Sequence, residues 1–236
     1  MFRLLSTFLD VCVVTCFSPF CPICLKEIKW GVKNPCCEPV HFIESPVCLS
    51  CGSQTQNDNN ICGKCFNAEP QLIDQVRSLL WYGESAKVLI HMVKYQGRFE
   101  WFNAFFECLN AQSFPFNTGG FHLLPVPIHR NKFLKRGFNQ SEILAQYISN
   151  LTSVPISTGL KKRRETTPQS ALNHEERKSN LQDVFVWDFK KPIPEKIILI
   201  DDIYTTGETL KACAKVLRAL GVKELLAWTL FRTPQK

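Results

Sequence analysis

An unbroken aliphatic run that ends in two acidic residues constrains the fold of this chain more than any other feature. Residues 197–200 read Ile-Ile-Leu-Ile, and Asp201 and Asp202 follow them directly. A strand without polar alternation is typical of a parallel sheet that is covered on both faces. Because a helix is expected over residues 207–220 and a strand over residues 224–231, this order indicates a doubly wound α/β domain.

The rest of the chain after residue 68 favours the same fold class. Its apolar patterning predicts further strands over residues 76–82, 121–126, 184–187 and 196–200, an amphipathic helix over residues 84–95 and an aromatic-rich helix over residues 99–109. Asn139 and Glu142 form a capping pair for another helix, which is expected to end near Asn150. Residues 161–180 are polar and strongly charged, so we expect a mobile loop there.

Polar residues that suit a phosphorylated sugar follow the strand, which is expected to end at Ile200. In open α/β sheets, ligands bind beyond the carboxyl ends of the strands. Hydroxyls and backbone N–H groups at a helix N-terminus can surround a phosphate, and we assign this role to Thr205, Thr206, Gly207 and Thr209. The carboxylates of Asp201 and Asp202 would repel a phosphate, so we assign them to ribose hydroxyls and Mg²⁺. The alternative is an ordinary turn in which the acidic residues cap the next helix.

Cysteine is the outlier of the composition, since ten of the twelve cysteines fall in the first 65 positions. Eight of them form four pairs: Cys21 and Cys24, Cys36 and Cys37, Cys48 and Cys51, and Cys62 and Cys65. Four pairs are enough for two tetrahedral four-cysteine zinc sites. Such closed sites leave no position for water, so their zinc would be structural and would stabilise the folded chain.

The two predicted zinc sites differ in regularity. The last two pairs are both Cys-x-x-Cys turns, whereas Cys36 and Cys37 are adjacent, and adjacent side chains usually diverge. His41 is an alternative ligand for the less regular site. An iron–sulfur cluster is the alternative to zinc, but paired turns suit a zinc ribbon better than a ferredoxin-type run. Thiols that hold metal would place the chain in a reducing cytoplasm.

Composition divides the chain into three parts: an apolar lead-in helix over residues 1–20, a double zinc ribbon over residues 21–68, and the α/β domain over residues 69–236. No apolar run reaches the roughly 20 residues of a membrane-spanning helix, and the lead-in fits a signal peptide poorly. We therefore predict no membrane span. The net charge of +7 favours anionic partners, although a solvated basic surface is equally consistent with it.

Several motifs resemble those of known families. Residues 197–209 look like the phosphoribosyl diphosphate signature of type I phosphoribosyltransferases, with Tyr204 where an aliphatic residue is usual. Other motifs are similar to those of the ComF family of competence proteins: Lys94-Tyr95-Gln96-Gly97-Arg98, Pro125-Val126-Pro127, Arg136-Gly137-Phe138-Asn139-Gln140, and the spaced set Arg164, Thr166, Gln169, Leu172, Arg177 and Asn180. With the cysteine pairs, the resemblance covers nearly the whole chain. It implies a type I phosphoribosyltransferase-like parallel sheet behind an N-terminal double zinc ribbon.

The resemblance also implies roles for residues outside the signature. Val126 and Pro127 would contact the diphosphate, through a non-proline cis peptide bond of the strained kind found at functional sites. The basic residues Arg130 and Arg136 follow just after them. The segment from Lys161 to Arg177 would close over the ligand as a hood that excludes water, and it carries Arg164 and Arg177. A solvated charge run is the alternative for residues 161–164.

Three functions are consistent with these features. The first is a competence protein that binds phosphoribosyl diphosphate and handles incoming single-stranded DNA in the cytoplasm, with a helicase or another DNA-processing protein as its partner. Lys26, Lys29 and Trp30 are candidate DNA contacts for it. The second is an active phosphoribosyltransferase for a nucleobase or an amine, and the third is a phosphoribosyl diphosphate sensor without turnover. The sequence identifies neither an acceptor site nor a catalytic residue.

Overall fold

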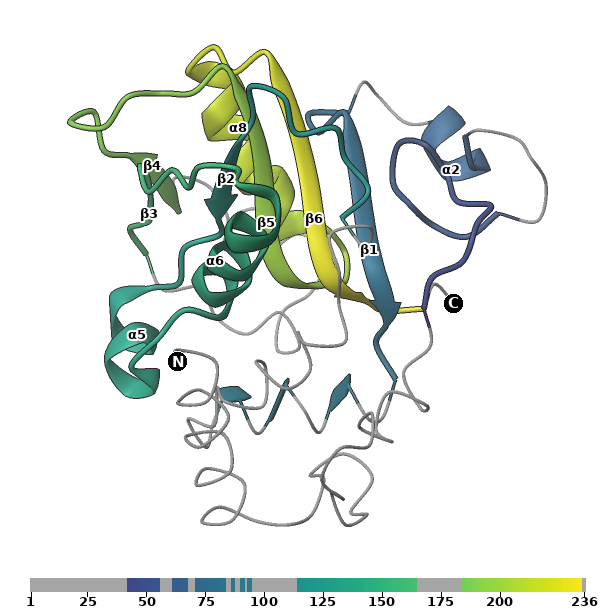
Figure 1. Cartoon of the computed structure of the whole chain (residues 1–236), viewed down its shortest axis with the longest axis horizontal. Coiled ribbons are helices and arrows are strands. Elements are labelled where there is room, and N and C mark those ends of the chain that lie inside the picture. Colours follow the sequence, from purple (N-terminus) through teal and green to yellow (C-terminus); the bar gives the residue numbers. More distant parts are fainter. Residues whose placement is uncertain are drawn as a thin grey trace, which may run out of the picture.

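A four-stranded parallel sheet forms the centre of the protein, whose computed structural model describes residues 42–55, 61–67, 71–83, 86–87, 90–91, 93–94, 114–164 and 184–234. The strand order is β1-β6-β5-β2, with bounds Gln75–Trp81, Glu224–Arg232, Lys196–Tyr204 and His122–Pro125. All three pairings in this sheet are parallel, and Figure 1 shows helices packed against it. The α/β class that the aliphatic run predicts is confirmed.

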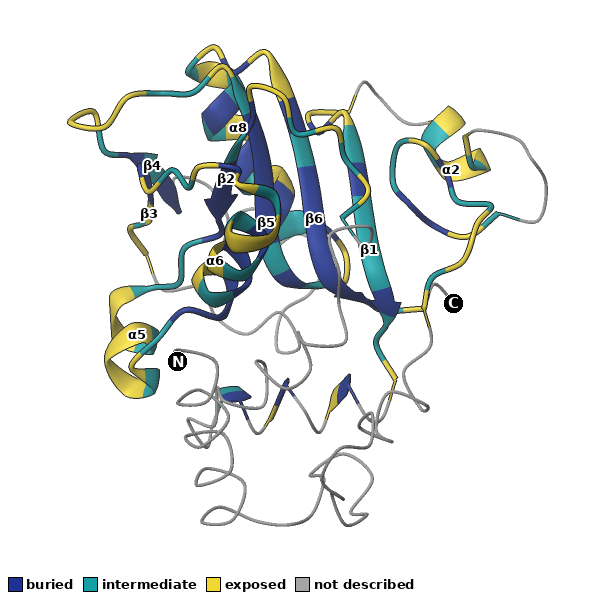
Figure 2. Ribbon diagram, viewed as in Figure 1, coloured by how far each residue is buried: buried dark blue, intermediate teal, exposed yellow. Residues whose placement is uncertain are grey.

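Alternation along β5 decides which helix packs on which face of the sheet. Ile198 and Ile200 belong to the core with α6 (Gln140–Thr152), whereas Ile197 and Leu199 belong to the core with α8 (Glu208–Ala219). Successive side chains of a strand point to opposite faces, so a sheet covered on both sides requires an apolar residue at each position. All four are fully buried (Figure 2), and each burial stabilises the fold by about 1.5–3 kcal/mol.

The helices agree with the sequence pattern at α6 and differ from it at α5. Asn139 caps α6 as predicted, because its Oδ1 accepts a hydrogen bond from the backbone N–H of Ser141 at 3.2 Å. The helix runs two residues past the expected end at Asn150. The short helix α5 (Arg130–Arg136) was not predicted, because its sequence has no periodic apolar face. None of its residues is buried in the structure. It ends at Gly137, whose φ of 82° is left-handed.

The predicted end of the central strand at Ile200 is wrong. β5 continues through Tyr204, and it stays paired with β6 as far as Arg232. Backbone N–H and C=O groups pair whatever the polarity of the side chain, so the acidic residues do not interrupt the strand. Asp201 and Asp202 are therefore strand residues rather than part of the turn.

The segment expected to be a loop over residues 161–180 begins as a strand. β3 (Leu160–Lys162) pairs antiparallel with β4 (Phe185–Trp187), so the prediction of a loop at Lys161 and Lys162 is wrong. Leu160, Phe185 and Trp187 are buried in the core with α8, and this packing outweighs the charge of the intervening residues. Residues 165–183 lie outside the described residues.

Other predictions fall partly or wholly outside the described residues. The helix expected over residues 84–95 is described only at three short places, where Ala86, Ile90 and Val93 are buried. The apolar face predicted for it and the helix over residues 99–109 are not among the described residues. The same holds for residues 1–41, with the lead-in helix, the first two cysteine pairs and His41. Within the described part of the chain, no helix has the length and apolarity needed to cross a bilayer.

Candidate functional site

The two acidic residues of β5, which we call the acid pair, lie at the carboxyl edge of the sheet. The neighbouring strand β2 ends at Pro125, which pairs with Ile200. The backbone N–H of Val126 then donates to the carbonyl of Ile200 at 2.9 Å. Beyond this point β5 continues alongside β6, so Asp201 and Asp202 reach past the end of β2. This is the edge at which open α/β sheets bind ligands.

The N-terminus of α6 holds the first member of the acid pair. Ser141 Oγ donates to Asp201 Oδ1 at 2.9 Å, and the backbone N–H of Asp202 donates to the same oxygen at 2.9 Å. Asn139 Nδ2 donates to the carbonyl of Val126 at 3.0 Å, which ties the start of α6 to the loop after β2. Burial, together with the charge of Asp202, raises the pKa of Asp201 to about 7, although these hydrogen bonds favour the carboxylate.

A lysine neutralises the second member of the acid pair. Lys94 Nζ lies 2.6 Å from Asp202 Oδ2, and both side chains are largely buried. Burial by itself would lower the pKa of Lys94, but the charge of Asp202, its hydrogen bond with Lys94 and the charge of Asp201 together outweigh burial, so this pKa is raised. The acid pair therefore attracts a cation within the chain itself, and this is the electrostatic property that a Mg²⁺ site requires.

A turn rich in hydroxyl groups connects β5 to α8, and we call its residues 205–209 the hydroxyl loop. Thr205 and Thr206 are exposed, and Thr209 is partly exposed in the first turn of the helix. Gly207 has a φ of 77°, and a Cβ there would lie 2.7 Å from Tyr204 Oη, so glycine is required. No side chain caps α8, which leaves the N–H groups of its first turn able to bind an anion.

The loop after β2 departs from the prediction in one respect. Val126 and Pro127 follow the strand directly, at the same edge as the acid pair. The peptide bonds of this loop are trans, and within the described residues the cis peptide bond is that between Ser45 and Pro46. The predicted cis bond is therefore wrong. The backbone N–H of Val126 extends the ladder with Ile200 by one more hydrogen bond.

The arginines that the sequence singled out lie in separate segments. Arg130 and Arg136 are the first and last residues of α5. Arg136 Nη1 donates to Gln140 Oε1 at 3.1 Å, so this guanidinium lies at the start of α6, the helix whose Ser141 binds Asp201. Arg164 is exposed just after β3. Arg177 lies outside the described residues.

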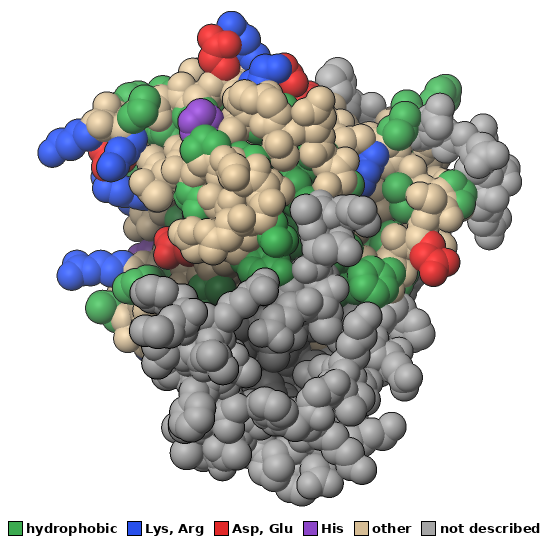
Figure 3. Space-filling model, in the orientation of Figure 1, with side chains coloured by type: hydrophobic (Ala, Val, Ile, Leu, Met, Phe, Trp, Pro, Cys, Tyr) green, Lys and Arg blue, Asp and Glu red, His purple; other side chains and the backbone are tan. Residues whose placement is uncertain are grey.

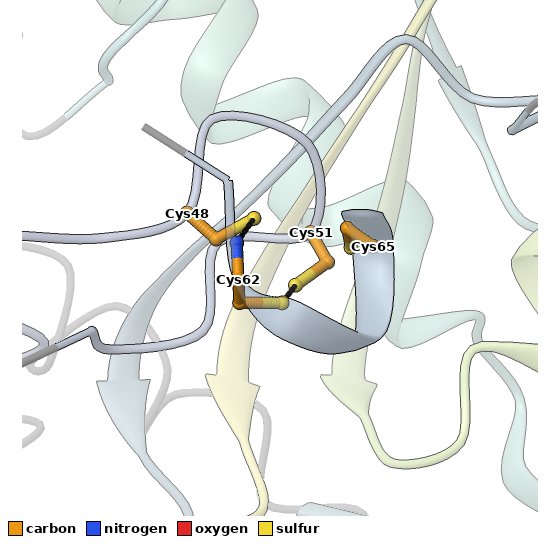
Figure 4. Close-up of side chains that lie close together, drawn as sticks. All are labelled: Cys48, Cys51, Cys62 and Cys65. Carbon is orange, nitrogen blue, oxygen red and sulfur yellow. Dashed lines mark hydrogen bonds between the residues drawn. The ribbon is translucent and has the colours of Figure 1, made fainter. Parts of the chain in front are cut away.

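Four cysteines converge next to the edge strand β1 and form a cluster that we call the metal knuckle: Cys48, Cys51, Cys62 and Cys65. Their sulfurs all lie within 4.8 Å of one another, and the sulfurs of Cys51 and Cys62 are 3.8 Å apart (Figure 4). Tetrahedral zinc with bonds of about 2.3 Å needs sulfurs about 3.8 Å apart. All four thiols are free of disulfides. The cluster can hold one metal ion, which is consistent with structural zinc.

Hydrogen bonds prepare part of the metal knuckle to lose protons. Burial opposes ionisation of Cys62, but bonds with the backbone of Cys65 and with Ser53 help to lower its pKa to about 6. The pKa of Cys48 is also lowered, whereas burial and the neighbouring thiols raise that of Cys65. Because the thiolate is the form that binds metal, the lowered values favour metal binding at neutral pH.

The metal knuckle is fixed to the strands β1 and β6. The backbone N–H of Val76 donates to the carbonyl of Ser50 at 2.7 Å. The backbone of Gly52 approaches Val76 so closely that a Cβ would overlap its carbonyl oxygen. Arg77 on β1 and Arg232 on β6 also donate to carbonyls of the knuckle. The ribbon and the sheet therefore form one connected structure in this region.

Sequence reasoning assigned no role to three residues that lie at the acid pair or next to it: Lys94, Gln140 and Ser141. Gln140 is only 2% exposed, and its Nε2 has no hydrogen-bond partner in the described part of the chain. Lys94 and Gln140 both stand in motifs that carry the family resemblance, and this was the available signal. Ser141 gave no such signal in the sequence, since serine is common at the start of any helix.

Comparison with known proteins found relatives that match most of the chain, although no family model matches it. Competence protein F of Haemophilus influenzae is 31% identical over 217 residues, which cover 88% of this chain and 93% of that protein. DNA utilization protein YhgH of Escherichia coli K12 is 28% identical over 224 residues, or 90% of this chain and 95% of that protein. Competence protein ComFC of Bacillus subtilis is 29% identical over 209 residues, or 84% and 82% of the two chains.

Proposed function

This chain belongs to the ComF family of competence proteins, and on that premise we propose that it binds 5-phosphoribosyl diphosphate with Mg²⁺ and handles incoming single-stranded DNA in the cytoplasm. The similarity to proteins named for competence and for DNA utilization supports a role in competence. The ligand is inferred from the chemistry of the site.

One observation carries the proposal for the ligand. The acid pair and the hydroxyl loop follow each other on β5 and α8, at the carboxyl edge of a parallel sheet. An anion at the N-terminus of α8 and a cation at the acid pair would then lie a few residues apart. A ribose with a 5-phosphate and a metal-bound diphosphate has this distribution of charge, whereas a simple phosphate or a simple metal ion has only half of it.

The parts of the ligand can be assigned to the residues of the site. Thr205, Thr206, Gly207 and Thr209 bind the 5-phosphate, and the acid pair binds the ribose hydroxyls and Mg²⁺. The diphosphate lies toward Val126, Pro127, Arg130 and Arg136. The hood carries Arg164 and Arg177. The pairing of β3 with β4 and the hydrogen bond from Arg163 N to Val184 O at 2.7 Å hold together the two described segments that flank residues 165–183, and the first of these segments begins the hood.

In this proposal, the metal that the knuckle binds is zinc, and its role is structural. Four sulfur ligands leave no open position for water or substrate, so the ion stabilises the ribbon and does not take part in chemistry. The second zinc site remains a prediction for Cys21, Cys24, Cys36 and Cys37. A measured content of two zinc ions per chain supports both sites, and one ion supports the metal knuckle alone.

The helix α5 offers a surface suited to single-stranded DNA. Its exposed side chains include the basic residues Arg130 and Lys135 and the apolar residues Phe133 and Leu134, which are 43% and 69% exposed. Figure 3 shows basic and hydrophobic side chains next to each other along this edge of the molecule. Bases stack on aromatic side chains while the phosphates bind to cations, so this combination favours a single strand.

The test of the ligand is a thermal unfolding experiment on the full-length chain. We expect phosphoribosyl diphosphate with Mg²⁺ to raise the melting temperature, because a ligand that binds the folded state stabilises it. The double substitution Asp201→Asn and Asp202→Asn should abolish this rise. The matched control is Glu224→Gln, which removes a carboxylate at the opposite end of the sheet. A rise of equal size in the double variant would remove the acid pair from the site.

Turnover is a separate question, and diphosphate release in the presence of nucleobases and amines tests it. Release that depends on one acceptor would identify an active phosphoribosyltransferase. Binding without release in a broad acceptor screen favours the competence role or a sensor of phosphoribosyl diphosphate. The competence role further requires binding to single-stranded DNA, which a sensor does not.

A further inference from the structure

The last residue of β6 is a buried cation with incomplete hydrogen bonding. Arg232 is 1% exposed. Its Nη1 donates to the carbonyl of Cys51 at 2.5 Å, whereas Nε and Nη2 have no partner within the described residues. A buried charge with unpaired donors is costly unless an opposite charge lies close to it. The surroundings of Arg232 should therefore contain such a charge.

Carboxylates do not supply it in the part of the chain that is described. None of the ion pairs there includes Arg232 or its neighbour Arg77. Arg218 makes a useful comparison, since it also donates to backbone carbonyls, yet its Nη2 lies 2.6 Å from the carboxylate of Asp74. The ring of Tyr204 lies 4.5 Å from the Arg232 guanidinium but carries no net charge, so a partner of another kind is needed for Arg232.

Both of these arginines converge on the same turn of the metal knuckle. Arg77 Nη1 donates to the carbonyls of Cys48 and Leu49 at 3.2 and 2.9 Å. Arg232 reaches the carbonyl of Cys51 from the neighbouring strand. Strands β1 and β6 are paired, so the two guanidinium groups approach the turn of residues 48–51 from adjacent strands.

The charges balance when the knuckle holds a divalent metal. Four thiolates and one divalent cation carry a net charge of −2, and two guanidinium groups carry +2. We propose that Arg77 and Arg232 are positioning residues that neutralise the metal–tetrathiolate centre and fix its first turn to the sheet. This inference rests on the metal centre of the proposed function. It explains why a buried arginine tolerates two unpaired donors beside a cluster of thiolates.

The test measures zinc affinity of the full-length chain by competition with a chromophoric chelator. Arg232→Met and Arg77→Met should each weaken zinc binding by about 10- to 100-fold, as is usual when a group that supports the ligands is lost. Arg232→Lys should recover most of the loss, because it restores the charge. Arg218→Met is the matched control, and we expect it to leave zinc affinity unchanged. The pH at which half of the zinc is lost should rise in both methionine variants.

The outcomes separate this inference from the metal centre itself. A wild-type chain that binds no zinc would overturn both. Zinc-loaded wild type together with unchanged affinity in both methionine variants would overturn only the role of the arginines. Arg232→Lys as weak as Arg232→Met would also overturn it, since charge would then not be the cause. If Arg232→Met does not fold, the partly exposed Arg77 decides the matter through its methionine and lysine variants.

Discussion

The guanidinium of Arg232 lies over the ring of Tyr204, with 4.5 Å between its carbon and the ring centroid. Tyr204 Oη in turn lies so close to Gly207 that it leaves no room for a Cβ there, and the N–H of Thr233 donates to the carbonyl of Tyr204 at 3.0 Å. Arg232 also binds the carbonyl of Cys51. A short series of contacts therefore joins the metal knuckle to the hydroxyl loop, the two parts to which different ligands are assigned.

Removal of zinc should weaken the binding of phosphoribosyl diphosphate. When the knuckle loses its metal, the Cys51 carbonyl is no longer held in place, and Arg232 and Tyr204 lose their support next to the hydroxyl loop. We expect the affinity to fall by about fivefold or more, within the usual range for coupled sites. Isothermal titration calorimetry with and without zinc measures it. Tyr204→Leu should show a smaller dependence on zinc, and equal affinities in the wild type would refute the coupling.

Asp201 should make the ligand-free chain less stable as the pH rises. Its pKa in the folded state is about 7, above the ordinary value of 3.8. The folded state therefore binds more protons than the unfolded state between these values, so stability falls as the pH rises from 3.8 and the loss is complete once the pH has passed about 7. The loss is at most about 4 kcal/mol, because one pKa unit corresponds to about 1.4 kcal/mol.

Chemical denaturation between pH 6 and pH 8 measures the last part of this loss, with zinc bound throughout so that metal loss does not contribute. Asp201→Asn serves as the comparison, since its side-chain carbonyl can still accept from Ser141. The free energy of unfolding should fall more steeply in the wild type than in Asp201→Asn. Parallel curves for the two proteins would show that Asp201 titrates normally.

Gly207→Ala should abolish phosphate binding and destabilise the chain by about 1–3 kcal/mol, the usual cost of strained backbone at a non-glycine residue. The new Cβ would meet Tyr204 Oη and would need a left-handed φ. Gly119→Ala is the matched control, because the neighbour of its Cβ lies 3.7 Å away and its φ is not left-handed. Thermal unfolding with and without phosphoribosyl diphosphate measures both effects. Retained ligand stabilisation in Gly207→Ala would contradict the assignment of the hydroxyl loop.

The surface of α5 should make binding of single-stranded DNA depend on salt. We expect the logarithm of the affinity to fall linearly with the logarithm of the salt concentration, because phosphate contacts release counterions. Arg130→Glu with Lys135→Glu should weaken binding and reduce that slope, whereas Phe133→Ala should weaken binding by about 1–3 kcal/mol per stacked base and leave the slope unchanged. Fluorescence anisotropy with a labelled oligonucleotide measures both quantities. Unaltered binding in the charge-reversed variant would exclude α5 as the contact.

Local sequence determined the elements whose signals lie within a few residues. The run from Ile197 to Ile200 required burial on both faces and so a covered parallel sheet, because adjacent side chains of a strand point in opposite directions. The Cys-x-x-Cys turns at Cys48 and Cys62 likewise brought their sulfurs into one cluster. Such features depend on spacing along the chain, which the sequence displays directly.

Tertiary structure alone decided the features that join distant residues. The acid pair remains within β5 because β6 continues beside it, and Lys94 reaches Asp202 across more than a hundred residues. The contact of Arg232 with both Cys51 and Tyr204 depends on the order of strands in the sheet. Strand order follows from the packing of whole faces rather than from any local pattern, and this is why the link between the metal knuckle and the hydroxyl loop appears only in the folded chain.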